Sequence, residues 1–296
     1  MGHLRALSLL TRMPKAKILA IVGPTASGKS ALAVHLAKKF GGEIISADSR
    51  QIYKGLDIGT GKITKKEMRG VRHHMLDVAD SRKQFSVAEY KKLAEEKISK
   101  IKFPIIVGGT GFYIDALTGR ANFPNVPPNK GLRKKLSQKS VIELFKILKK
   151  KDPRRAETVD RHNKVRLVRA LEIVETLGKV PVPRHKVSGR FIYIGLKPSD
   201  SDKRIYQRLV KRIPGIIRET KKLPFKRAYE LGLEYRYAAL YLKKKINKKE
   251  MVEKLNTAIR QYAKRQITWF KRNKEIKWFR PEEYGEIEKH VKRMIG

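Results

Sequence analysis

Residues 18–30 read ILAIVGPTASGKS, and this segment indicates the architecture of the whole 296-residue chain. Its first part, Ile18–Val22, is a short apolar run of the kind that forms a buried strand in a parallel sheet. Its second part, Gly23–Ser30, fits the pattern G-x-x-x-x-G-K-[ST]. A helical pattern follows at Ala31–Phe40, with apolar residues four positions apart. A strand, a glycine-rich loop and a helix in this order predict a loop that binds phosphate groups.

Strand and helix patterns continue to alternate along the chain. Apolar runs predict strands at Glu43–Ala47, Pro104–Val107 and Arg190–Leu196. Between the first two, Phe85–Ile101 has a helical pattern that opens behind Ser86. This order is typical of a parallel sheet with helices on its faces. We therefore predict an α/β fold: a P-loop-type parallel sheet core flanked by helices, with a helical insertion domain.

The insertion is the segment 118–189. It begins with a breaker cluster, Thr118–Pro128, and continues with helical patterns at about 129–150 and 162–178. The tail has further helical patterns near 202–213, 226–243 and 247–273. The predicted domains are a disordered extension at 1–15, a P-loop-like catalytic core at 16–117 and 190–296, and the basic helical insertion at 118–189.

The charge of the chain is strongly unbalanced. Seventy Lys and Arg against 28 Asp and Glu give a formal net charge of +42. The excess is densest in residues 118–189, which hold 19 basic and 6 acidic side chains. Such a surface favours a polyanionic partner, either nucleic acid or an anionic membrane. The alternative is a lysine-rich lineage in which the charges only solvate helices.

Composition also excludes several classes of protein. The chain has no Cys, which excludes disulfides, thiolate zinc sites and a cysteine nucleophile. No run approaches the roughly 18 consecutive apolar residues that a membrane span needs, and no signal peptide is recognisable. Hydrophobic residues make up 41% of the chain, enough for a buried core. We therefore expect a cytoplasmic, soluble monomer with no membrane contact and no obligate protein partner.

The glycine-rich loop carries the first chemical prediction. Its glycines let backbone N–H groups wrap a diphosphate, and the following helix adds a favourable dipole. Lys29 supplies a positive charge, and the Ser30 hydroxyl can bind Mg²⁺, which we predict as the cofactor. The predicted diphosphate-binding residues are Gly23, Pro24, Thr25, Ala26, Ser27, Gly28, Lys29 and Ser30.

An acidic residue stands beside this loop in the predicted fold. P-loop kinases and ATPases place an Asp after an apolar strand to hold Mg²⁺, but the later strand here ends in Gly108 and Gly109. The acidic candidate is Asp48, directly after the Glu43–Ala47 strand, where open α/β sheets form their ligand crevice. Ordinary nucleotide hydrolysis is therefore not expected. An alternative is that Asp48 only caps a helix or binds Mg²⁺.

Several motifs around the loop together resemble one family, the tRNA dimethylallyltransferases (tRNA isopentenyltransferases). They are DSRQIY (48–53), GLDIGT (55–60), GGTGFY (108–113), RHNKVRLVRALEIVETLGKVP (161–181) and RQYAKRQITWF (260–270). The similarity runs from about Ile18 to Phe279. The resemblance implies transfer of a dimethylallyl group from dimethylallyl diphosphate to N6 of adenine 37 in the tRNA anticodon loop.

The resemblance also implies roles for particular residues. Asp48 corresponds to the family's general base, and Thr110 lies at the reacting centre. Arg208 and Arg212, one helical turn apart, would contact the diphosphate together with Lys29, although charges on a solvated helix are the plainer explanation. Ser49, Arg50 and Gln51 adjoin Asp48 and would hold the flipped adenine and its neighbours.

Contacts to the tRNA anticodon stem-loop are expected mainly from the insertion. Arg166 and Arg169 are three positions apart on one predicted helix, an arrangement suited to phosphate contacts. The tRNA-binding residues implied by the resemblance are Asp48, Ser49, Arg50, Gln51, Thr110, Arg133, Val165, Arg166, Leu167, Val168, Arg169, Lys264, Arg265 and Gln266. Trp269 and Phe270, which end the last motif, are expected in the core.

The sequence departs from the family's pattern at one place, and three other functions remain possible alternatives. Pro214-Gly215 follows Ile213 directly where the family has a longer stretch, so the helix near 202–213 is expected to be cut short. The rivals are a P-loop kinase of small molecules, a non-catalytic RNA-binding protein with a vestigial P-loop, and an isopentenyltransferase that acts on free adenine nucleotide.

Overall fold

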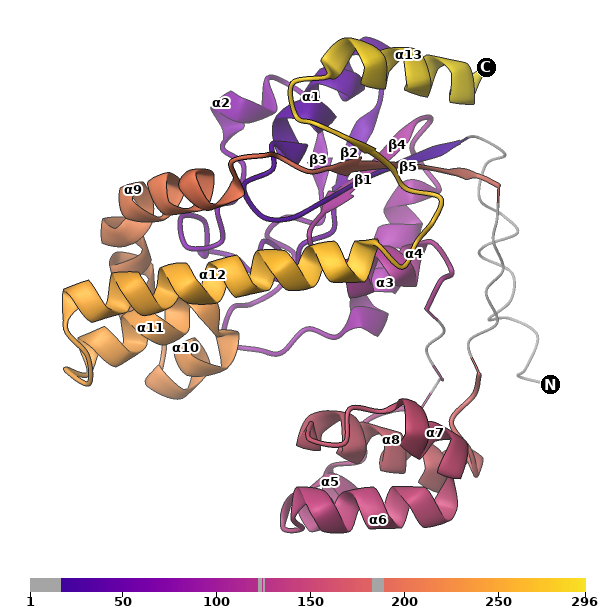
Figure 1. The fold of residues 1–296 in the computed structure, drawn as a ribbon, viewed down its shortest axis with the longest axis vertical. Helices are drawn as coiled ribbons and strands as arrows, with labels where there is room; N and C mark the ends of the chain where they lie inside the picture. Colours follow the sequence, from indigo (N-terminus) through magenta and orange to yellow (C-terminus); the bar gives the residue numbers. More distant parts are fainter. Residues whose placement is uncertain (1–16, 122–123, 125, 183–188) are drawn as a thin grey trace. The chain divides into compact units, whose positions relative to one another are not determined.

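The computed structural model describes residues 17–121, 124, 126–182 and 189–296 (Figure 1). The chain divides into two compact units, the first containing residues up to Thr118 and from Val187 onward, the second Gly119–Lys186. The second unit corresponds to the basic segment that the sequence inserts between two strands of the sheet. The predicted extension at 1–15 lies outside the described residues.

A six-stranded sheet is the centre of the first unit. Its strands are ordered β3-β2-β4-β1-β5-β6 and all pair in parallel. This confirms the predicted α/β fold with a parallel sheet. The strands are β1 (Ile18–Val22), β2 (Glu43–Ser46), β3 (His73–His74), β4 (Pro104–Gly108), β5 (Phe191–Leu196) and β6 (Lys277–Phe279).

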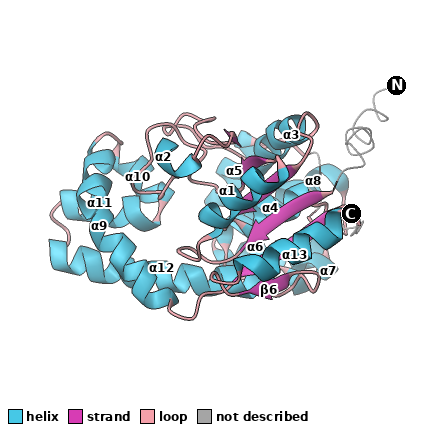
Figure 2. Ribbon diagram, turned by 90° about the horizontal axis from the view of Figure 1, so that it is seen from above, coloured by secondary structure: helices cyan, strands magenta, loops and turns pink. Residues whose placement is uncertain are grey.

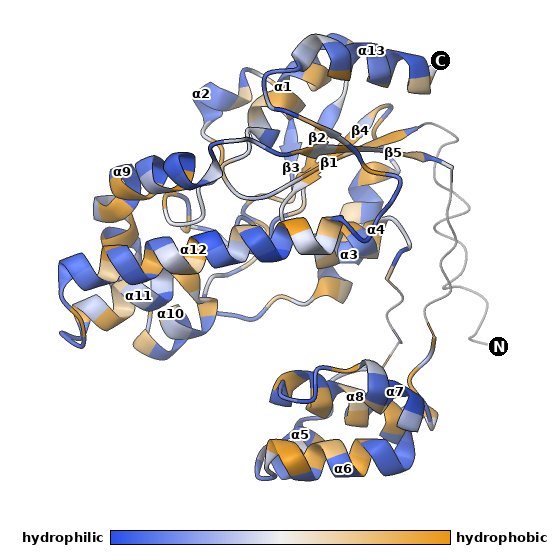
Figure 3. Ribbon diagram, in the orientation of Figure 1, coloured by the Kyte–Doolittle hydropathy of each residue, from blue (hydrophilic) through white to orange (hydrophobic). Residues whose placement is uncertain are grey.

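Both faces of the sheet are covered by helices, as Figures 1 and 2 show. Successive side chains of a strand point to opposite faces, so Ile18 and Ala20 enter one core while Leu19 and Ile21 enter the other. The central strands β1 and β4 are therefore buried along their whole length, and Figure 3 shows the apolar colouring of the middle of the sheet. Helices α1 (Lys29–Phe40) and α13 (Tyr284–Ile295) cover one face, and α3 (Val87–Ile98) and α4 (Gly111–Leu117) cover the other.

Four helices of the tail precede β6: three of them form a third core beside the phosphate loop, and the second in chain order packs into the core on the α3 and α4 side of the sheet. They are α9 (Ser201–Lys221), α10 (Phe225–Leu231), α11 (Leu233–Leu242) and α12 (Lys248–Phe270). Ala26 of the loop packs into this third core with Ile205, Leu209 and Ile259. The end of α12 returns to the sheet, where Phe270 is buried as expected. The tail thereby packs directly against the loop that the opening motif predicts.

Two tail helices differ from the sequence-based prediction. Helix α9 continues through Pro214 to Lys221 instead of ending near residue 213. Proline removes one backbone donor from a helix, but buried contacts of Ile213 and Ile216 on both sides of it hold the helical path. The helix predicted at 226–243 is two helices, because Gly232 takes φ 71° and separates α10 from α11.

The second unit is a small helical domain with its own apolar core. Its helices are α5 (Lys130–Ser137), α6 (Val141–Lys151), α7 (Pro153–Thr158) and α8 (Lys164–Leu177), with a core that includes Leu136, Leu144, Leu148 and Leu167. The helical pattern predicted at about 129–150 is thus divided between two helices, α5 and α6. Ser140 and Glu143 form a capping box that starts α6 as a separate helix.

Short elements complete the architecture. Helix α2 (Lys65–Met68), the two-residue strand β3, helices α4 and α7, and the final pair β6 and α13 were not expected from sequence periodicity. None of the helices in the described ranges combines the length and apolarity needed to cross a bilayer.

Candidate active site

The carboxyl ends of β1, β2 and β4 meet at one edge of the sheet and open into a cavity. Each strand is followed by a polar loop: Gly23–Gly28 after β1, Asp48 after β2, and Gly109-Thr110 after β4. Predicted site residues that line the cavity are Thr25, Ala26, Lys29, Ser30, Asp48, Arg50, Gln51, Arg208, Arg212 and Gln266. A second cavity adjoins it and shares Lys29, Ser30, Arg208 and Arg212.

The phosphate loop has the backbone conformation that its glycines predict. Gly23 takes φ 146°, and a Cβ there would lie 2.5 Å from the carbonyl oxygen of Leu196. Ala26 and Gly28 take φ 61° and 86°, in the left-handed region. The loop then runs into α1, whose first residue is Lys29. Backbone N–H groups at this helix start provide an anion site.

Lys29 lies within this loop. Its Nζ donates to the carbonyl oxygen of Pro24 and, at 3.2 Å, to the hydroxyl of Ser27. Burial lowers the pKa of Lys29 to about 7; the Asp48 carboxylate opposes this shift, and the nearby Arg208 adds to it. The ammonium therefore lacks enough negative charge around it to stay protonated well above neutral pH. A bound anion would supply that charge.

Asp48 caps a turn and faces the cavity at the same time. Its Oδ1 accepts hydrogen bonds from the backbone N–H groups of Arg50 (2.9 Å) and Gln51 (3.4 Å). Within the described chain, no hydrogen bond reaches Oδ2. Asp48 thus caps a turn and not the helix that the sequence suggested, and this uses one carboxylate oxygen and leaves the other for a ligand.

Thr110 ties the loop after β4 to the loop after β2. Its Oγ1 accepts from the backbone N–H of Ser49 at 3.0 Å and donates to the Ser49 hydroxyl at 3.3 Å. Gly108 makes the close approach possible, because a Cβ there would lie 2.1 Å from the carbonyl oxygen of Ala47. Ser49 and Thr110 therefore set the position of the Asp48 turn.

Gln266 on α12 joins the phosphate loop to the β4 loop. Its Oε1 accepts from the backbone N–H of Thr25 at 2.9 Å, and its Nε2 donates to the carbonyl oxygen of Gly109 at 2.8 Å. The residue is only 6% exposed. Both ends of its amide are used inside the protein, so Gln266 joins the two loops, and its contact with tRNA stays a prediction. The neighbouring Lys264 and Arg265 are exposed and stay predicted RNA contacts.

Arg208 and Arg212 reach the cavity from one face of α9. Nη1 of Arg212 donates to the carbonyl oxygens of Ile58 and Gly59, and its Nη2 lies 3.5 Å from Oε1 of Glu234. Arg208 keeps exposed surface as a residue, yet desolvation of its guanidinium and repulsion from Arg212 lower its pKa. With Lys29, these groups concentrate positive charge at the phosphate loop.

The predicted RNA-binding arginines of the second unit are partly engaged with a carboxylate. Arg133 binds Glu172 through two nitrogens at 2.9 and 2.8 Å, and Arg169 binds the same carboxylate and the carbonyl oxygen of Val126. Glu172 is fully buried, and its pKa is about 2 despite desolvation, because the arginine hydrogen bonds outweigh burial. Arg133 and Arg169 therefore help to hold this unit together.

The α8 residues proposed for RNA binding divide by exposure. Val165 is 78% exposed and Arg166 is exposed, while Val168 is half-buried. Leu167 has no exposed surface and packs in the core of the unit. Leu167 is therefore not available to RNA, which corrects its assignment. Val165 and Arg166 form the accessible start of the helix.

Comparison with known proteins assigns the family. Residues 51–273 match the IPP transferase family. The chain belongs to this family, that of the tRNA dimethylallyltransferases. It is 40% identical to a tRNA dimethylallyltransferase of Thermoanaerobacter sp. strain X514, over 94% of this chain and 96% of that protein. A relative from Geotalea uraniireducens is 41% identical over 86% of this chain and 88% of its own length.

Solved structures agree with this assignment. The tRNA isopentenylpyrophosphate transferase of Bacillus halodurans superposes with a TM-score of 0.71 at 34% identity, covering 95% of this chain and 97% of that one. A eukaryotic dimethylallyltransferase acting on tRNA gives a TM-score of 0.74 at 25% identity, over 94% of this chain and 77% of its own. As a member of this family the chain is an enzyme, a transferase that modifies tRNA.

Sequence reasoning did not identify three residues that shape the cavity. Tyr262 and Glu234 line it, and burial followed by the Asp48 charge raises the pKa of Tyr262 to about 12. Glu219, on α9, is outside the cavity lining and accepts hydrogen bonds from residues 57–59, in the loop that Arg212 also contacts. Tyr262 stands within the RQYAKRQ motif, which could have drawn attention to it, whereas no local pattern marks Glu219.

The cavity offers few ligands for a metal ion. Among the described residues, no group of three or more His, Asp or Glu side chains is arranged to hold one. The Ser30 hydroxyl at the start of α1 is the donor that fits Mg²⁺, which commonly takes one or two protein ligands and completes its shell with phosphate oxygens and water. The residues present therefore fit a metal ion that arrives with a diphosphate.

The pKa of Lys29 predicts how diphosphate binding varies with pH. Free Lys29 loses its proton above about pH 7, whereas bound diphosphate stabilises the charged form. Affinity for inorganic diphosphate is expected to fall by up to about tenfold per pH unit above neutrality. Calorimetry across this range measures it. Lys29→Arg stays charged and is the control; an equally steep alkaline fall in that variant would contradict the prediction.

The Gln266 bridge predicts a local loss of stability. Gln266→Ala leaves a backbone N–H of Thr25 and a carbonyl of Gly109 without partners. We expect the free energy of unfolding to fall by about 2–4 kcal/mol, with weaker binding of inorganic diphosphate. Gln261→Ala, an exposed glutamine on the same helix, is the matched control. Chemical denaturation measures both proteins, and equal stability of the two variants would show that the bridge contributes nothing.

Proposed function

We propose that the chain transfers a dimethylallyl group from dimethylallyl diphosphate to N6 of adenine 37 in the tRNA anticodon loop, giving N6-isopentenyladenosine. One observation carries the proposal: the Asp48 carboxylate and the diphosphate-binding groups line a single cavity. Membership of the tRNA dimethylallyltransferases supplies the reaction class.

The leaving group of this reaction is a diphosphate whose negative charge grows as its bond breaks. The phosphate loop Gly23–Gly28 supplies backbone N–H groups, and Lys29, Arg208 and Arg212 supply positive charge around them. Donors fixed before the reaction stabilise such charge most effectively, because they need no rearrangement in the transition state. This set therefore lowers the barrier to departure of diphosphate.

The carboxylate of Asp48 handles the proton. The lone pair of adenine N6 attacks C1 of the dimethylallyl group while the bond from C1 to the diphosphate oxygen breaks. N6 then carries an extra proton, which passes to Oδ2 of Asp48, the oxygen not used by the turn. Thr110 and Ser49 hold this turn in place and so orient the base.

Mg²⁺ is the proposed cofactor at the diphosphate end. When bound, the ion would neutralise part of the diphosphate charge, with Ser30 as its protein ligand. The residues of the chain orient the diphosphate beside it: Lys29 from α1, and Arg208 and Arg212 from α9.

The tRNA side of the proposal rests on two surfaces. Arg50 and Gln51 line the cavity next to Asp48 and would hold the flipped adenine and its neighbours. Exposed basic residues, Arg166 in the second unit and Lys264 and Arg265 on α12, would contact the phosphates of the anticodon stem-loop. The density of basic residues in the second unit supports RNA as the polyanionic partner.

Transfer to an anticodon stem-loop tests the proposal against its rivals. With labelled dimethylallyl diphosphate, the label is expected on a stem-loop with A37 and not on free AMP or on an A37→G stem-loop. Equal labelling of AMP would favour the isopentenyltransferase that uses free nucleotide. ATP consumption without any RNA would favour the kinase, and absence of transfer with tight RNA binding would favour the non-catalytic protein.

Asp48→Asn separates the two uses of this residue. Asparagine keeps an Oδ1 acceptor for the N–H groups of Arg50 and Gln51, so the turn survives, but its amide is no base at neutral pH. We expect the single-turnover rate to fall by about 10²–10⁴, with stem-loop affinity nearly unchanged. A rate close to that of the wild type would mean that Asp48 only caps the turn.

Arg166→Ala tests the RNA surface of the second unit. Arg169 is left intact because its removal would take one of the arginine partners from the buried Glu172 carboxylate and destabilise the unit. Loss of one phosphate contact is expected to weaken stem-loop binding and reduce the slope of log affinity against log salt by about one. Lys292→Ala, exposed on α13, removes the same charge elsewhere and serves as the control. An identical salt slope in both variants would contradict the assignment.

A further inference from the structure

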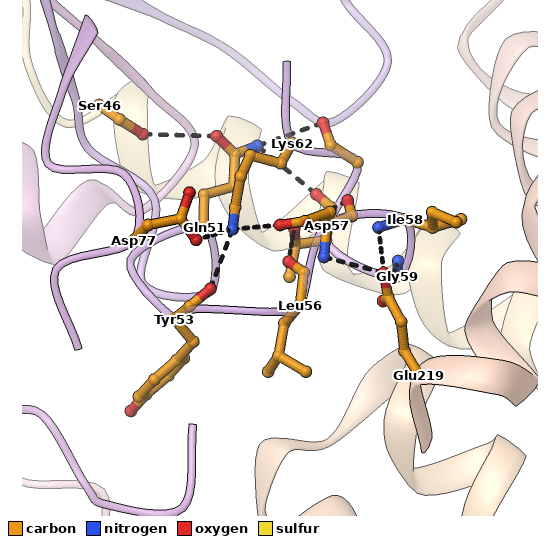
Figure 4. Close-up of polar contacts among 12 residues, drawn as sticks. Ser46, Gln51, Tyr53, Leu56, Asp57, Ile58, Gly59, Lys62, Asp77 and Glu219 are labelled. Atoms are coloured by element: carbon orange, nitrogen blue, oxygen red, sulfur yellow. Dashed lines mark hydrogen bonds and ion pairs between the residues drawn. The ribbon is translucent and has the colours of Figure 1, made fainter. Parts of the chain in front are cut away.

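One face of α9 grips a loop that borders the cavity. The loop, Leu56–Lys62, belongs to the GLDIGTGK segment after β2. Arg208, Arg212, Gly215 and Glu219 follow one another at helical spacing along α9, and three of them touch this loop. Figure 4 shows Glu219 approaching the loop residues Asp57, Ile58 and Gly59.

Glu219 binds the loop through its backbone N–H groups. Oε1 accepts from Asp57 at 3.0 Å and Ile58 at 2.7 Å, and Oε2 accepts from Gly59 at 2.9 Å. A fourth donor, the hydroxyl of Tyr235, reaches Oε2 at 2.9 Å. Three consecutive N–H groups that converge in this way form a concave anion site. Here the anion is a side chain of the protein, 7% exposed.

Arg212 binds the carbonyl groups of the same turn, whereas Glu219 binds its N–H groups. Its Nη1 donates to the carbonyl oxygens of Ile58 and Gly59 at 3.2 and 3.3 Å. Since Glu219 holds the N–H groups and Arg212 the C=O groups of these residues, the turn cannot rotate without breaking one set. The positions of the two side chains are therefore linked through two peptide units.

Glycines let the helix, the loop and the arginine approach closely. A Cβ on Gly215 would lie 2.5 Å from Ile58, and a Cβ on Gly61 would lie 2.8 Å from Nη1 of Arg212. A Cβ on Gly59 would lie 2.5 Å from the Tyr235 hydroxyl. The absence of a side chain at Gly61 thus leaves room for the Arg212 guanidinium beside the loop.

The other side of the loop is anchored as well. Lys62 bridges Asp57 at 2.5 Å and Asp77 at 2.6 Å, and it donates to the carbonyl oxygen of Tyr53 at 2.9 Å (Figure 4). Gln51, in the Asp48 turn, approaches the carbonyl oxygen of Gly61 at 3.4 Å. The loop thus spans from the Asp48 turn to α9.

We propose that Glu219 is a positioning residue for the leaving-group end of the reaction: it holds the 57–59 turn so that the turn fixes the Arg212 guanidinium against the diphosphate. This inference rests on the proposed function for the identity of the anion. Glu219 itself touches no substrate. Its influence passes through two peptide groups to Arg212, which lines both cavities.

A double-mutant cycle tests this coupling, with inorganic diphosphate as the probe. Glu219→Gln is nearly isosteric but replaces one acceptor oxygen with a donor nitrogen facing the N–H groups. We expect diphosphate affinity to fall by about 10-fold to 100-fold in the wild-type background. In an Arg212→Ala background the same change is expected to cost less than about threefold, because the group it positions is absent.

Two further variants separate positioning from general stability. Tyr235→Phe removes one donor to Glu219 but leaves the three loop contacts, and it is expected to change diphosphate affinity by less than about threefold. Gly61→Ala adds a Cβ at φ 61° and 2.8 Å from Nη1 of Arg212, so it strains the loop and displaces Arg212 while Glu219 is unchanged, and it is expected to reproduce the loss and its dependence on Arg212. This variant keeps the test open if Glu219→Gln fails to fold, which a thermal melt would reveal.

An equal loss from Glu219→Gln in both backgrounds overturns the proposal, as does unchanged diphosphate affinity in the single variant. A loss in Tyr235→Phe as large as that in Glu219→Gln also counts against it. Because the probe is diphosphate without RNA, these results do not depend on prenyl transfer. Failure of A37 labelling with the coupling intact would overturn the proposed function and leave the positioning role in place.

Discussion

The amide of Gln266 is the contact on which the arrangement of the cavity depends. It connects the phosphate loop after β1 to the loop after β4, and the β4 loop in turn holds the Asp48 turn through Thr110. Three loops that leave three different strands are thereby fixed relative to one another by short hydrogen bonds. Parallel strands bring such loops to one edge of the sheet, but they do not set the distance between a carboxylate and a phosphate loop. Gln266 on α12 and Thr110 in the loop after β4 set it here.

Charge in the cavity is organised so that an anion completes it. Lys29, Arg208 and Arg212 converge on the two cavities, where the carboxylates that share the lining are Asp48, Asp57, Glu67 and Glu234. Burial is the first cause of the lowered pKa values of Lys29 and Arg208, and repulsion from a neighbouring arginine adds to each shift. Repulsion between like charges costs free energy. Hydrogen bonds from Arg212 to two loop carbonyl oxygens offset part of this cost. An arriving diphosphate would relieve the repulsion, so binding and charge neutralisation are the same event.

Local patterns in the sequence were sufficient for the strands of the core, the phosphate loop and the position of Asp48. Strand β1 and the loop after it are encoded within 13 consecutive residues, 18–30. The contacts that shape the cavity are different, because Glu219 meets Gly59 across 160 positions and Gln266 meets Thr25 across 241. Hydrophobic periodicity predicts local helices and strands, and it does not predict contacts between residues so far apart in the sequence. Pro214 misled the prediction for a related reason: its unfavourable local effect is outweighed by burial of the helix on both sides.

The second unit shows why a large positive charge is a weak guide to individual contacts. Arg133 and Arg169 belong to the basic excess of 118–189, yet both are spent on Glu172, a buried carboxylate inside the same unit. Their charge still adds to the field around the unit, which falls off over roughly 8–10 Å at moderate salt. They therefore favour an approaching polyanion while part of their hydrogen-bonding capacity is used on Glu172, and exposed residues such as Arg166 are more available for direct contacts. The net charge indicates a polyanionic partner. The internal ion pairs determine which arginines are available to bind it.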